Sequence, residues 1–397
     1  MGDAAVTSGL SAERAVRGAV VVACAAFALW LHTAASIGFQ GGLHPTTLRD
    51  FGAFWAAGDA ANAGRDPYQT TALARAVVAP GGTERATNLN PPVSVLAFQL
   101  LARVPPAVAF RAWQVGSALG YVGMVAGLTL GARPHAWGRA LLVLLWEPFW
   151  STVDLGQIYV GLAVAVLVAT ALLRRNPAVA GLVIGAVVAL KPQFVLWPLF
   201  LLAARQRRPA VAGAISAAAL SLLPVVFGHV DWYVGWWHAI ARWRFLAFSD
   251  NLSLVSILAR AGVPDGLAAV ATAGVVGTLV AFARHRRIDS QRASTVGLVA
   301  AILAGPVSWV GYATVLAPDV LIQPKWSEAT LVAAALLAIP GALIWWSDQA
   351  GFLAYDVALA HLLLGSFQRP PDAFEGPVGK VERAAHQRLP PGALAEN

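Results

Sequence analysis

Residues 178–204 read AVAGLVIGAVVALKPQFVLWPLFLLAA, which is two apolar runs that meet at Lys191-Pro192-Gln193. Lys191 is the one charged residue in this stretch. A helix that crosses a bilayer needs about 20 largely apolar residues, whereas soluble domains rarely carry so long an uncharged run. Because proline interrupts a helix, the two runs are predicted to form a broken membrane helix or a re-entrant pair.

The rest of the chain has the same character. Of its 397 residues, 58% are hydrophobic and 12% are charged, while soluble domains have about 25% charged residues. This composition excludes soluble, disordered and collagen-like proteins, and the single cysteine, Cys24, excludes a disulfide framework. We therefore expect an all-α polytopic membrane protein with about 10–12 transmembrane helices. The predicted spans are 18–39, 107–130, 140–153, 157–173, 178–190, 193–204, 210–227, 265–283, 293–312 and 329–346, with 351–365 as an additional or interfacial helix.

Arginines predict the orientation in the membrane. The net charge is +8, and thirteen arginines lie in short connections near 14–17, 133–139, 174–175, 205–208 and 284–292. The positive-inside rule places these connections and the N-terminus in the cytoplasm, which explains the basic charge without a nucleic-acid partner. Residues 1–368 are then one membrane domain in the plasma membrane, 40–106 an outer loop with interfacial helices, and 369–397 a disordered cytoplasmic tail.

The unusual polar residues then gather on the opposite, extracytoplasmic face. They lie in the loop around Asp50 and in segments 154–157, 191–193, 228–263 and 318–326. The span assignment did not use these residues, so their convergence indicates an outward-facing site.

Two ionisable residues are the first candidates for chemistry. Asp50 lies in Arg49-Asp50-Phe51-Gly52-Ala53-Phe54-Trp55, where partial desolvation among aromatic residues increases the basicity of a carboxylate and suits a general base. The alternative is an aromatic interfacial anchor with a solvated Asp–Arg pair. Lys191 costs about 2.5–3.5 kcal/mol inside a membrane on insertion scales, so it needs an anionic ligand such as a phosphate, or else it reaches the interface by snorkelling.

Other polar residues suit sugar hydroxyls or phosphate. Asp154 and Gln157 share a tight turn, where hydroxyl binding and helix capping are both possible. Tyr68 follows a Gly64-Arg65-Asp66-Pro67 turn and could line a pocket. The segment 228–263 is rich in tryptophan and arginine, which suit sugar rings and phosphates as well as the lipid interface. The chain has no D-x-D or HExxH motif, so neither a metal nor another cofactor is expected.

Two glycine series are predicted to serve helix packing. Gly116, Gly120, Gly123 and Gly127 are spaced within one predicted span, and Gly181 and Gly185 lie four apart in another. Small residues at this spacing let two helices approach closely.

Taken together, the motifs resemble glycosyltransferase family 87, the polyprenol-phosphate-mannose-dependent mannosyltransferases. The resemblance covers most of 45–312 and rests on Asp50-Phe51-x-x-Phe54-Trp55-x-Ala57-Gly58, Gly64-x-Asp66-Pro67-Tyr68, Asn90-Pro91-Pro92, Gly156-Gln157, Lys191-Pro192-Gln193, Asn251-x-Ser253-Leu254 and Pro306-x-Ser308-Trp309. It implies the GT-C fold, an active site on the outer face, and transfer with inversion from a lipid-phosphate donor without a metal. It also implies that Asp50 deprotonates the acceptor hydroxyl.

The chain departs from the family pattern after Trp309. Family members often have a histidine pair there, whereas this chain has Val310-Gly311-Tyr312. If those histidines hold the donor phosphate, other groups must replace them here. The candidates for the donor phosphate are Lys191, Arg260 and Arg244, and those for sugar or acceptor hydroxyls are Asp154, Gln157, Gln193, Asn251, Trp55 and Tyr68.

The expected function is therefore a membrane hexosyltransferase, similar to mannosyltransferases. Its expected partners are a polyprenyl-phosphate sugar, a cell-envelope glycolipid or polysaccharide acceptor, and membrane lipids. The alternative is a transporter or a flippase for lipid-linked sugars. A transporter is expected to show repeated halves and polar residues near the bilayer midplane, and the sequence shows neither.

Overall fold

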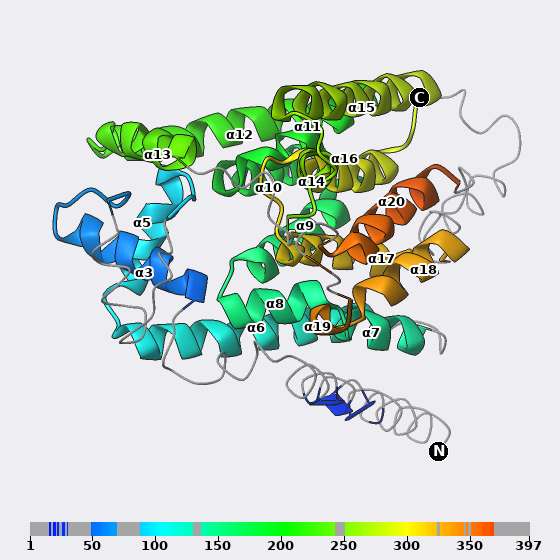
Figure 1. Ribbon diagram of the computed structural model, residues 1–397, viewed down its shortest axis with the longest axis horizontal. Coiled ribbons are helices and arrows are strands. Elements are labelled where there is room, and N and C mark those ends of the chain that lie inside the picture. Colours follow the sequence, from blue (N-terminus) through cyan, green and yellow to red (C-terminus); the bar gives the residue numbers. More distant parts are fainter. Residues whose placement is uncertain are drawn as a thin grey trace, which may run out of the picture.

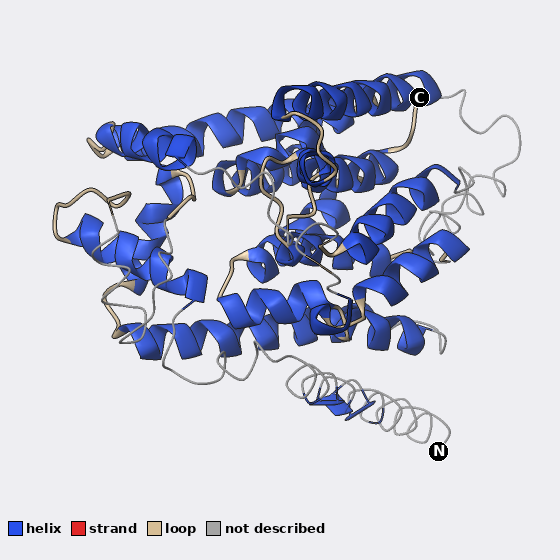
Figure 2. Cartoon of the chain, viewed as in Figure 1, coloured by secondary structure: helices blue, strands red, loops and turns tan. Residues whose placement is uncertain are grey.

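The computed structural model describes residues 49–69, 88–129, 136–242, 251–323, 326–344, 347 and 351–368, together with scattered positions between 16 and 30. Within these ranges the regular structure is helical, apart from one isolated bridge between Asn251 and Trp309 (Figure 2). The prediction of an all-α protein is confirmed.

Two of the described helical elements, η1 and η2, are 3-10 helices. In Figure 1, α3 and α5 lie at one end of the molecule and α18 and α20 near the other. In chain order they are α3 (Arg49–Asn62), α5 (Pro92–Leu101), α6 (Pro106–Thr129), α7 (Ala136–Leu144), α8 (Glu147–Leu155), α9 (Tyr159–Leu172), α10 (Pro177–Leu190), η1 (Pro192–Val195), α11 (Leu196–Ala203), α12 (Arg207–Val226), α13 (Asp231–Arg242), α14 (Leu254–Arg260), α15 (Asp265–Arg286), α16 (Ser290–Ala304), η2 (Val310–Leu316), α17 (Ala317–Leu321), α18 (Glu328–Leu337), α19 (Gly341–Ile344) and α20 (Leu353–Gln368).

Few of these helices are long enough to cross a bilayer alone. In the described part of the chain, α12 and α15 meet the length and composition of a span, and α5 with α6 forms a further candidate that is bent by 108°. The other apolar helices are shorter, and the predicted span 18–39 lies mostly outside the described residues. The protein is a membrane protein, but the described residues do not contain 10–12 full-length spans, because prolines and glycines divide the apolar runs. Pro148, for example, begins α8 instead of continuing α7.

Glycines allow α10 and α12 to pack closely. A Cβ atom on Gly181 would lie 2.5 Å from the carbonyl oxygen of Pro209, and one on Gly185 would lie 2.4 Å from that of Gly213. These glycines hold α10 against α12, so the packing prediction is confirmed for this pair. In α6, Gly120 faces Val160 of α9, 3.6 Å from an added Cβ, whereas around Gly116, Gly123 and Gly127 no atom of the described residues lies within 4 Å of it, so the described part of the chain shows no close packing at these three.

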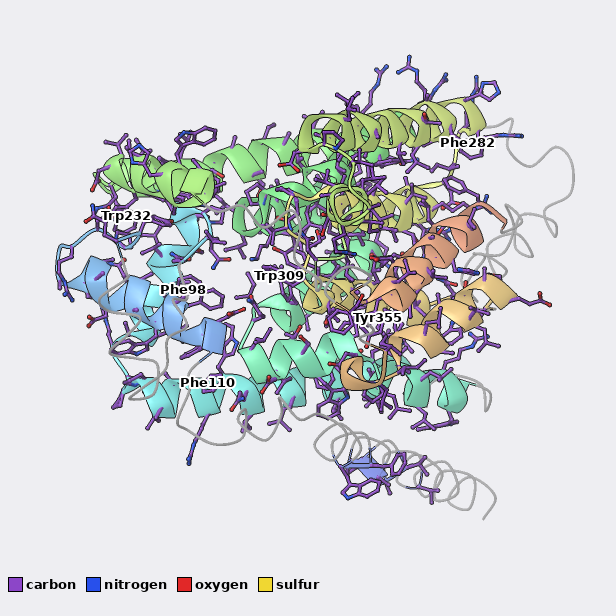
Figure 3. All side chains as sticks on the ribbon, viewed as in Figure 1. Phe98, Phe110, Trp232, Phe282, Trp309 and Tyr355 are labelled. Atoms are coloured by element: carbon purple, nitrogen blue, oxygen red, sulfur yellow. The ribbon has the colours of Figure 1, made fainter. Side chains whose placement is uncertain are left out.

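Helix α3, which carries Asp50, is held on both sides by aromatic contacts. The Phe54 ring stacks on Phe98 of α5 at 4.8 Å, and the Phe51 ring stacks on Phe110 of α6 at 5.3 Å. Figure 3 labels Phe98 and Phe110 on these two helices. Gly58 brings α3 closest to α5, because a Cβ there would lie 2.1 Å from the Phe98 carbonyl oxygen. The start of α3 is therefore fixed relative to both α5 and α6.

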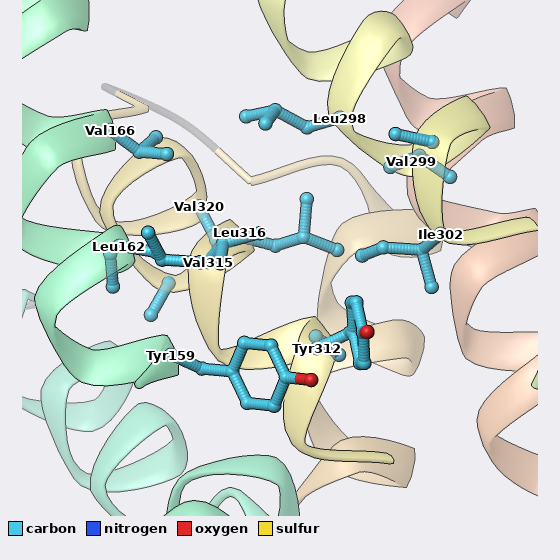
Figure 4. Packing of buried hydrophobic residues seen from close by; sticks show 14 of the residues in the cluster. Tyr159, Leu162, Val166, Leu298, Val299, Ile302, Tyr312, Val315, Leu316 and Val320 are labelled. Atoms are coloured by element: carbon cyan, nitrogen blue, oxygen red, sulfur yellow. The ribbon is translucent and has the colours of Figure 1, made fainter. Parts of the chain in front are cut away.

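The chain reverses once more than the sequence predicted. Helix α16 ends at Ala304, and after a short turn η2 and α17 run through the buried core, where Tyr312, Val315 and Val320 pack beside Leu162 of α9 (Figure 4). The predicted span 293–312 is therefore two segments.

This reversal corrects the predicted position of 318–326. Arg139 Nη1 donates a hydrogen bond of 2.7 Å to the Gln323 carbonyl oxygen, and the Arg139 guanidinium lies 5.2 Å from the Trp326 ring. The sequence prediction placed Arg139 and segment 318–326 on opposite faces, and these contacts show that they share one face.

Candidate active site

One cavity of about 960 Å³ collects polar side chains from many separate elements. Of the residues that the sequence singled out, it is lined by Asp50, Asp154, Gln157, Lys191 and Gln193. The remaining lining is formed by Ala53, Phe54, Leu89, Asn90, Pro91, Glu147, Ser151, Leu155, Tyr159, Pro192, Trp236, Ile240, Pro306, Val307, Trp309, Val310, Tyr312 and Phe352. The structure therefore brings the polar segments 50, 154–157, 191–193 and part of 228–263 to one site.

Helix α8 supplies one wall of this cavity. Glu147, Ser151, Asp154 and Leu155 all line it, and their spacing of four, three and one residues puts them on one helical face. Glu147 lies in the first turn of α8, where the helix dipole favours a carboxylate.

The Asp50 carboxylate is fixed by the turn that ends α8. Gln157 Nε2 donates a hydrogen bond to Asp50 Oδ2, and the Gln157 carbonyl oxygen accepts one from Trp113 Nε1 at 3.2 Å. Gly156, the residue before Gln157, caps α8. Its φ of 68° is a backbone conformation that favours glycine. A Cβ on Gly156 would lie 2.6 Å from the Phe51 Cβ. A side chain at 156 would therefore push away the residue that follows Asp50.

Lys191 lies at the break between α10 and η1, as the sequence predicted. Its backbone leaves the helical conformation, with φ −142° and ψ 90°, and its side chain is only 9% exposed. Its Nζ atom lies 3.4 Å from the Tyr312 hydroxyl and 5.3 Å from the centre of each of the Tyr159 and Tyr312 rings. Lys191 is therefore a buried ammonium held between two aromatic rings.

Another part of the cavity lining is a segment without regular helix, 306–309. Asn251 Nδ2 donates to the Pro306 carbonyl oxygen at 3.0 Å, and Asn251 Oδ1 accepts from the Ser308 backbone N–H at 2.9 Å. Gln193 Nε2 donates to the Val307 carbonyl oxygen at 3.4 Å. These bonds fix the segment 306–309, which carries Trp309 into the cavity lining.

A second irregular segment, 88–91, is held by side chains of other elements. The Tyr68 hydroxyl donates to the Asn90 carbonyl oxygen at 2.8 Å, and Trp236 Nε1 donates to that of Leu89 at 3.0 Å. Burial raises the pKa of the Tyr68 hydroxyl well above its usual value, with smaller contributions from Tyr233 and Asp66, so the hydroxyl keeps the proton that it donates. Asp66 Oδ1 accepts from the Tyr68 backbone N–H at 2.8 Å, which confirms the predicted turn.

Comparison with protein families identifies the chain. The model of glycosyltransferase family 87 matches residues 88–310, more than half of the sequence. The chain belongs to glycosyltransferase family 87. The comparisons with curated proteins and with solved structures find no match. The protein is therefore a membrane glycosyltransferase. The matched range contains the part of the cavity lining that runs from Leu89 to Val310 in the sequence.

The structure places four of the predicted site residues of this glycosyltransferase outside the cavity lining. Trp55 Nε1 donates to the Val104 carbonyl oxygen at 2.9 Å, and Tyr68 and Asn251 hold the irregular segments described above. Arg260 is 4% exposed at its side chain, bonds the Asn251 carbonyl oxygen at 3.0 Å, and lies 3.6 Å from Asp356 Oδ2. Trp55, Tyr68, Asn251 and Arg260 therefore make hydrogen bonds within the protein, and their predicted roles in binding the sugar, acceptor or phosphate stay predictions. Arg244 lies outside the described residues.

Sequence reasoning missed several residues that line the cavity of this glycosyltransferase. Glu147 was hidden inside the predicted span 140–153, although a carboxylate in an apolar run is itself a signal of function. Trp236 was seen as one member of a tryptophan-rich loop. The sequence marked Tyr312 only as part of Val310-Gly311-Tyr312, where the family's histidine pair is replaced, and nothing marked Tyr159, which begins the apolar helix α9; their meeting is purely tertiary.

Proposed function

We propose that this protein transfers a hexose, with mannose as the first sugar to test, from a polyprenyl-phosphate donor to a cell-envelope glycolipid or polysaccharide. The observation that carries the proposal is that one cavity is lined by both a positioned carboxylate, Asp50, and a buried ammonium, Lys191. Transfer from a phosphate-linked sugar needs these two functions, a base for the acceptor and a cation for the departing phosphate.

The chemistry follows from the two groups. Asp50 accepts the proton of the acceptor hydroxyl while that oxygen attacks the anomeric carbon of the sugar. A new glycosidic C–O bond forms, the bond from the anomeric carbon to the phosphate oxygen breaks, and the electron pair leaves with the polyprenyl phosphate. Attack opposite the leaving group inverts the anomeric configuration. Lys191 stabilises the negative charge that grows on the phosphate, in a site that burial keeps at low dielectric.

The arginines support a cavity that opens on the extracytoplasmic face. The cavity residues lie at one end of the segments whose other ends carry arginine. Tyr159 begins α9, which ends before Arg174 and Arg175, and these arginines line a smaller cavity of about 160 Å³ with Ser290, the first residue of α16. The positive-inside rule places that end in the cytoplasm.

The test of the proposal is transfer from a labelled donor. Membranes that contain the protein are incubated with radiolabelled polyprenyl-phosphate-mannose and a lipid extract of the cell envelope. Label is expected to appear in a new glycolipid, and Asp50→Asn is expected to abolish this product, because a general base contributes about 10²–10⁴ in rate. The matched control is Asp59→Asn on the same helix, whose carboxylate forms a partly exposed ion pair with Arg65 at 3.0 Å and is expected to be dispensable.

The same experiment separates the transporter alternative. Label that crosses the bilayer on an unchanged donor, without a new glycolipid, would contradict the transferase proposal and favour a flippase. Full transfer by the Asp50→Asn variant would remove Asp50 from the role of base.

A further inference from the structure

Lys191 has no carboxylate in direct ion-pair contact among the described residues. Its side chain is nine-tenths buried, and within the described residues no carboxylate lies within the 4.0 Å that defines an ion pair with its Nζ. The carboxylates that line the same cavity come from α3 and α8, and the groups next to Nζ are the Tyr312 hydroxyl and two aromatic rings. A buried cation with neutral neighbours is costly, so an anion would complete this site.

The two tyrosines supply hydrogen-bond donors at the same place. The Tyr159 and Tyr312 rings lie 4.3 Å apart at their centres, and Figure 4 shows the Tyr159 hydroxyl directed toward Tyr312. Tyr159 is 0% exposed and lines the cavity, and within the described residues its hydroxyl makes no hydrogen bond of ordinary geometry, although it lies close enough to Tyr312 to interact with it. Buried hydroxyls nearly always make full hydrogen bonds, so this hydroxyl beside a buried ammonium has a proton to donate to a bound anion.

Close packing of the backbone fixes the part of the cavity that Tyr159 and Tyr312 line. Tyr159 is the first residue of α9, and Tyr312 belongs to η2, whose Gly311 packs so closely that an added Cβ would lie 2.9 Å from Thr152 Oγ1 and 3.1 Å from the Tyr159 ring. Thr152 Oγ1 also bonds Thr314 Oγ1 at 3.2 Å. Tyr159 and Tyr312 therefore lie on closely packed helices and not on a loop.

We propose that Tyr159, Tyr312 and Lys191 form a phosphate-binding corner in which the two tyrosine hydroxyls donate hydrogen bonds to the phosphate oxygens and Lys191 supplies the charge. The ligand chemistry is a phosphate monoester or inorganic phosphate. This inference deepens the proposed function, because the polyprenyl phosphate that leaves the sugar is such a monoester. It assigns donor-phosphate contacts to two tyrosines that the sequence analysis did not propose as ligands.

The experiment measures binding without catalysis. The full-length protein in detergent is titrated with polyprenyl phosphate, with neutral polyprenol, and with inorganic phosphate, and the tryptophan fluorescence is recorded, because Trp236 and Trp309 line the cavity. Polyprenyl phosphate is expected to bind at least tenfold more tightly than polyprenol. Inorganic phosphate is expected to compete with polyprenyl phosphate for the site. If only inorganic phosphate binds, the three residues still form a phosphate site, and its ligand is the free ion.

Phenylalanine variants isolate the hydroxyls. Tyr159→Phe and Tyr312→Phe keep the rings that flank Lys191, and each is expected to weaken binding of the phosphate ligand about tenfold, as for the loss of one hydrogen bond to a charged group. Binding of polyprenol is expected to be unchanged. The matched control is Tyr121→Phe, which removes another fully buried hydroxyl, bonded at 2.8 Å to the Val143 carbonyl oxygen outside the cavity lining. Unfolding midpoints in the same detergent verify that the variants are folded.

Two results would overturn the inference. The first is that both variants bind the phosphates as tightly as the wild type, and the second is that they lose polyprenol binding to the same extent. The Asp50→Asn variant is expected to bind polyprenyl phosphate at least as tightly as the wild type. A protein that binds phosphate through the tyrosines but transfers no sugar would contradict the proposed function and leave this corner in place.

Discussion

Replacement of Gly156 by alanine tests how the fold positions Asp50. Gly156 has a φ of 68°, and this left-handed conformation costs a residue with a Cβ about 1–2 kcal/mol. The added Cβ would also lie 2.6 Å from the Phe51 Cβ and 2.7 Å from the Phe110 ring, well inside ordinary van der Waals contact. Overpacking of a filled site costs about 1–3 kcal/mol. The two costs together predict a destabilisation of about 2–5 kcal/mol.

The expected loss of activity exceeds what this destabilisation alone would cause. Phe51 follows Asp50 directly, and Gln157, which bonds the Asp50 carboxylate, follows Gly156 directly. A shift of either neighbour moves the carboxylate away from the acceptor hydroxyl, and a displacement of about 1 Å can cost about 10²-fold in rate. We therefore expect Gly156→Ala to fold with a lowered unfolding midpoint and to transfer sugar at about one hundredth of the wild-type rate.

Gly64→Ala is the matched control. Gly64 has nearly the same φ, +67°, but nothing lies within 4 Å of an added Cβ, so this variant carries the backbone cost without the clash. The assays are thermal unfolding of the full-length protein in detergent and transfer of labelled sugar in membranes. Equal destabilisation by the two substitutions, or wild-type transfer by Gly156→Ala, would refute the argument that the close packing at Gly156 holds Asp50.

Two further predictions concern the packing of the bundle. Gly181→Leu is expected to lower the unfolding free energy by about 1–3 kcal/mol, because α10 and α12 meet at this glycine. The control Gly116→Leu is expected to change it by no more than about 0.5 kcal/mol, since no atom of the described residues lies within 4 Å of its Cβ position. Equal changes in unfolding free energy for the two variants, measured in detergent, would contradict this prediction. Arg260→Ala is expected to cost about 1–3 kcal/mol, because it leaves the buried Asn251 carbonyl oxygen and Ser256 Oγ without their donor. A denaturant titration of both proteins checks this, and wild-type stability of the variant would contradict it.

Part of the site could be predicted from the sequence, because charged residues are scarce in this apolar chain and the position of each one relative to the predicted helices indicates on which side of the membrane it lies. Arginine clusters mark one set of short connections; Asp154 and Lys191 fall in short connections outside that set, and Asp50 lies beside Arg49 in a long loop. The cavity is lined by these three residues. Lys191 was also predictable as a helix break, since a lysine followed by proline cannot continue an apolar helix.

The roles of single polar residues were less predictable, because the same chemistry serves ligands and the fold. A guanidinium suits a phosphate and also a buried carboxylate, and only the tertiary structure brings Asp356 of α20 to Arg260 of α14. Asn251 resembled a ligand for hydroxyls, yet its amide holds the backbone of Pro306 and Ser308. In both cases the partner is distant in the sequence, so no local pattern distinguished the two roles.

The break after α16 explains both the wrong prediction of one span over 293–312 and the unexpected position of Tyr312 beside Lys191. The run 293–312 has the length of a single membrane helix, but Gly305 and Pro306 end α16, and the chain returns through the core as a 3-10 helix and a short α-helix too brief to be recognised as a crossing. The turn between the two segments supplies Trp309 to the cavity, while the return brings Gln323 and Trp326 to Arg139. Tyr312 lies at the start of that return, next to Lys191. The same helix break therefore hid the additional reversal from the sequence and brought to Lys191 the hydroxyl that we assign to phosphate binding.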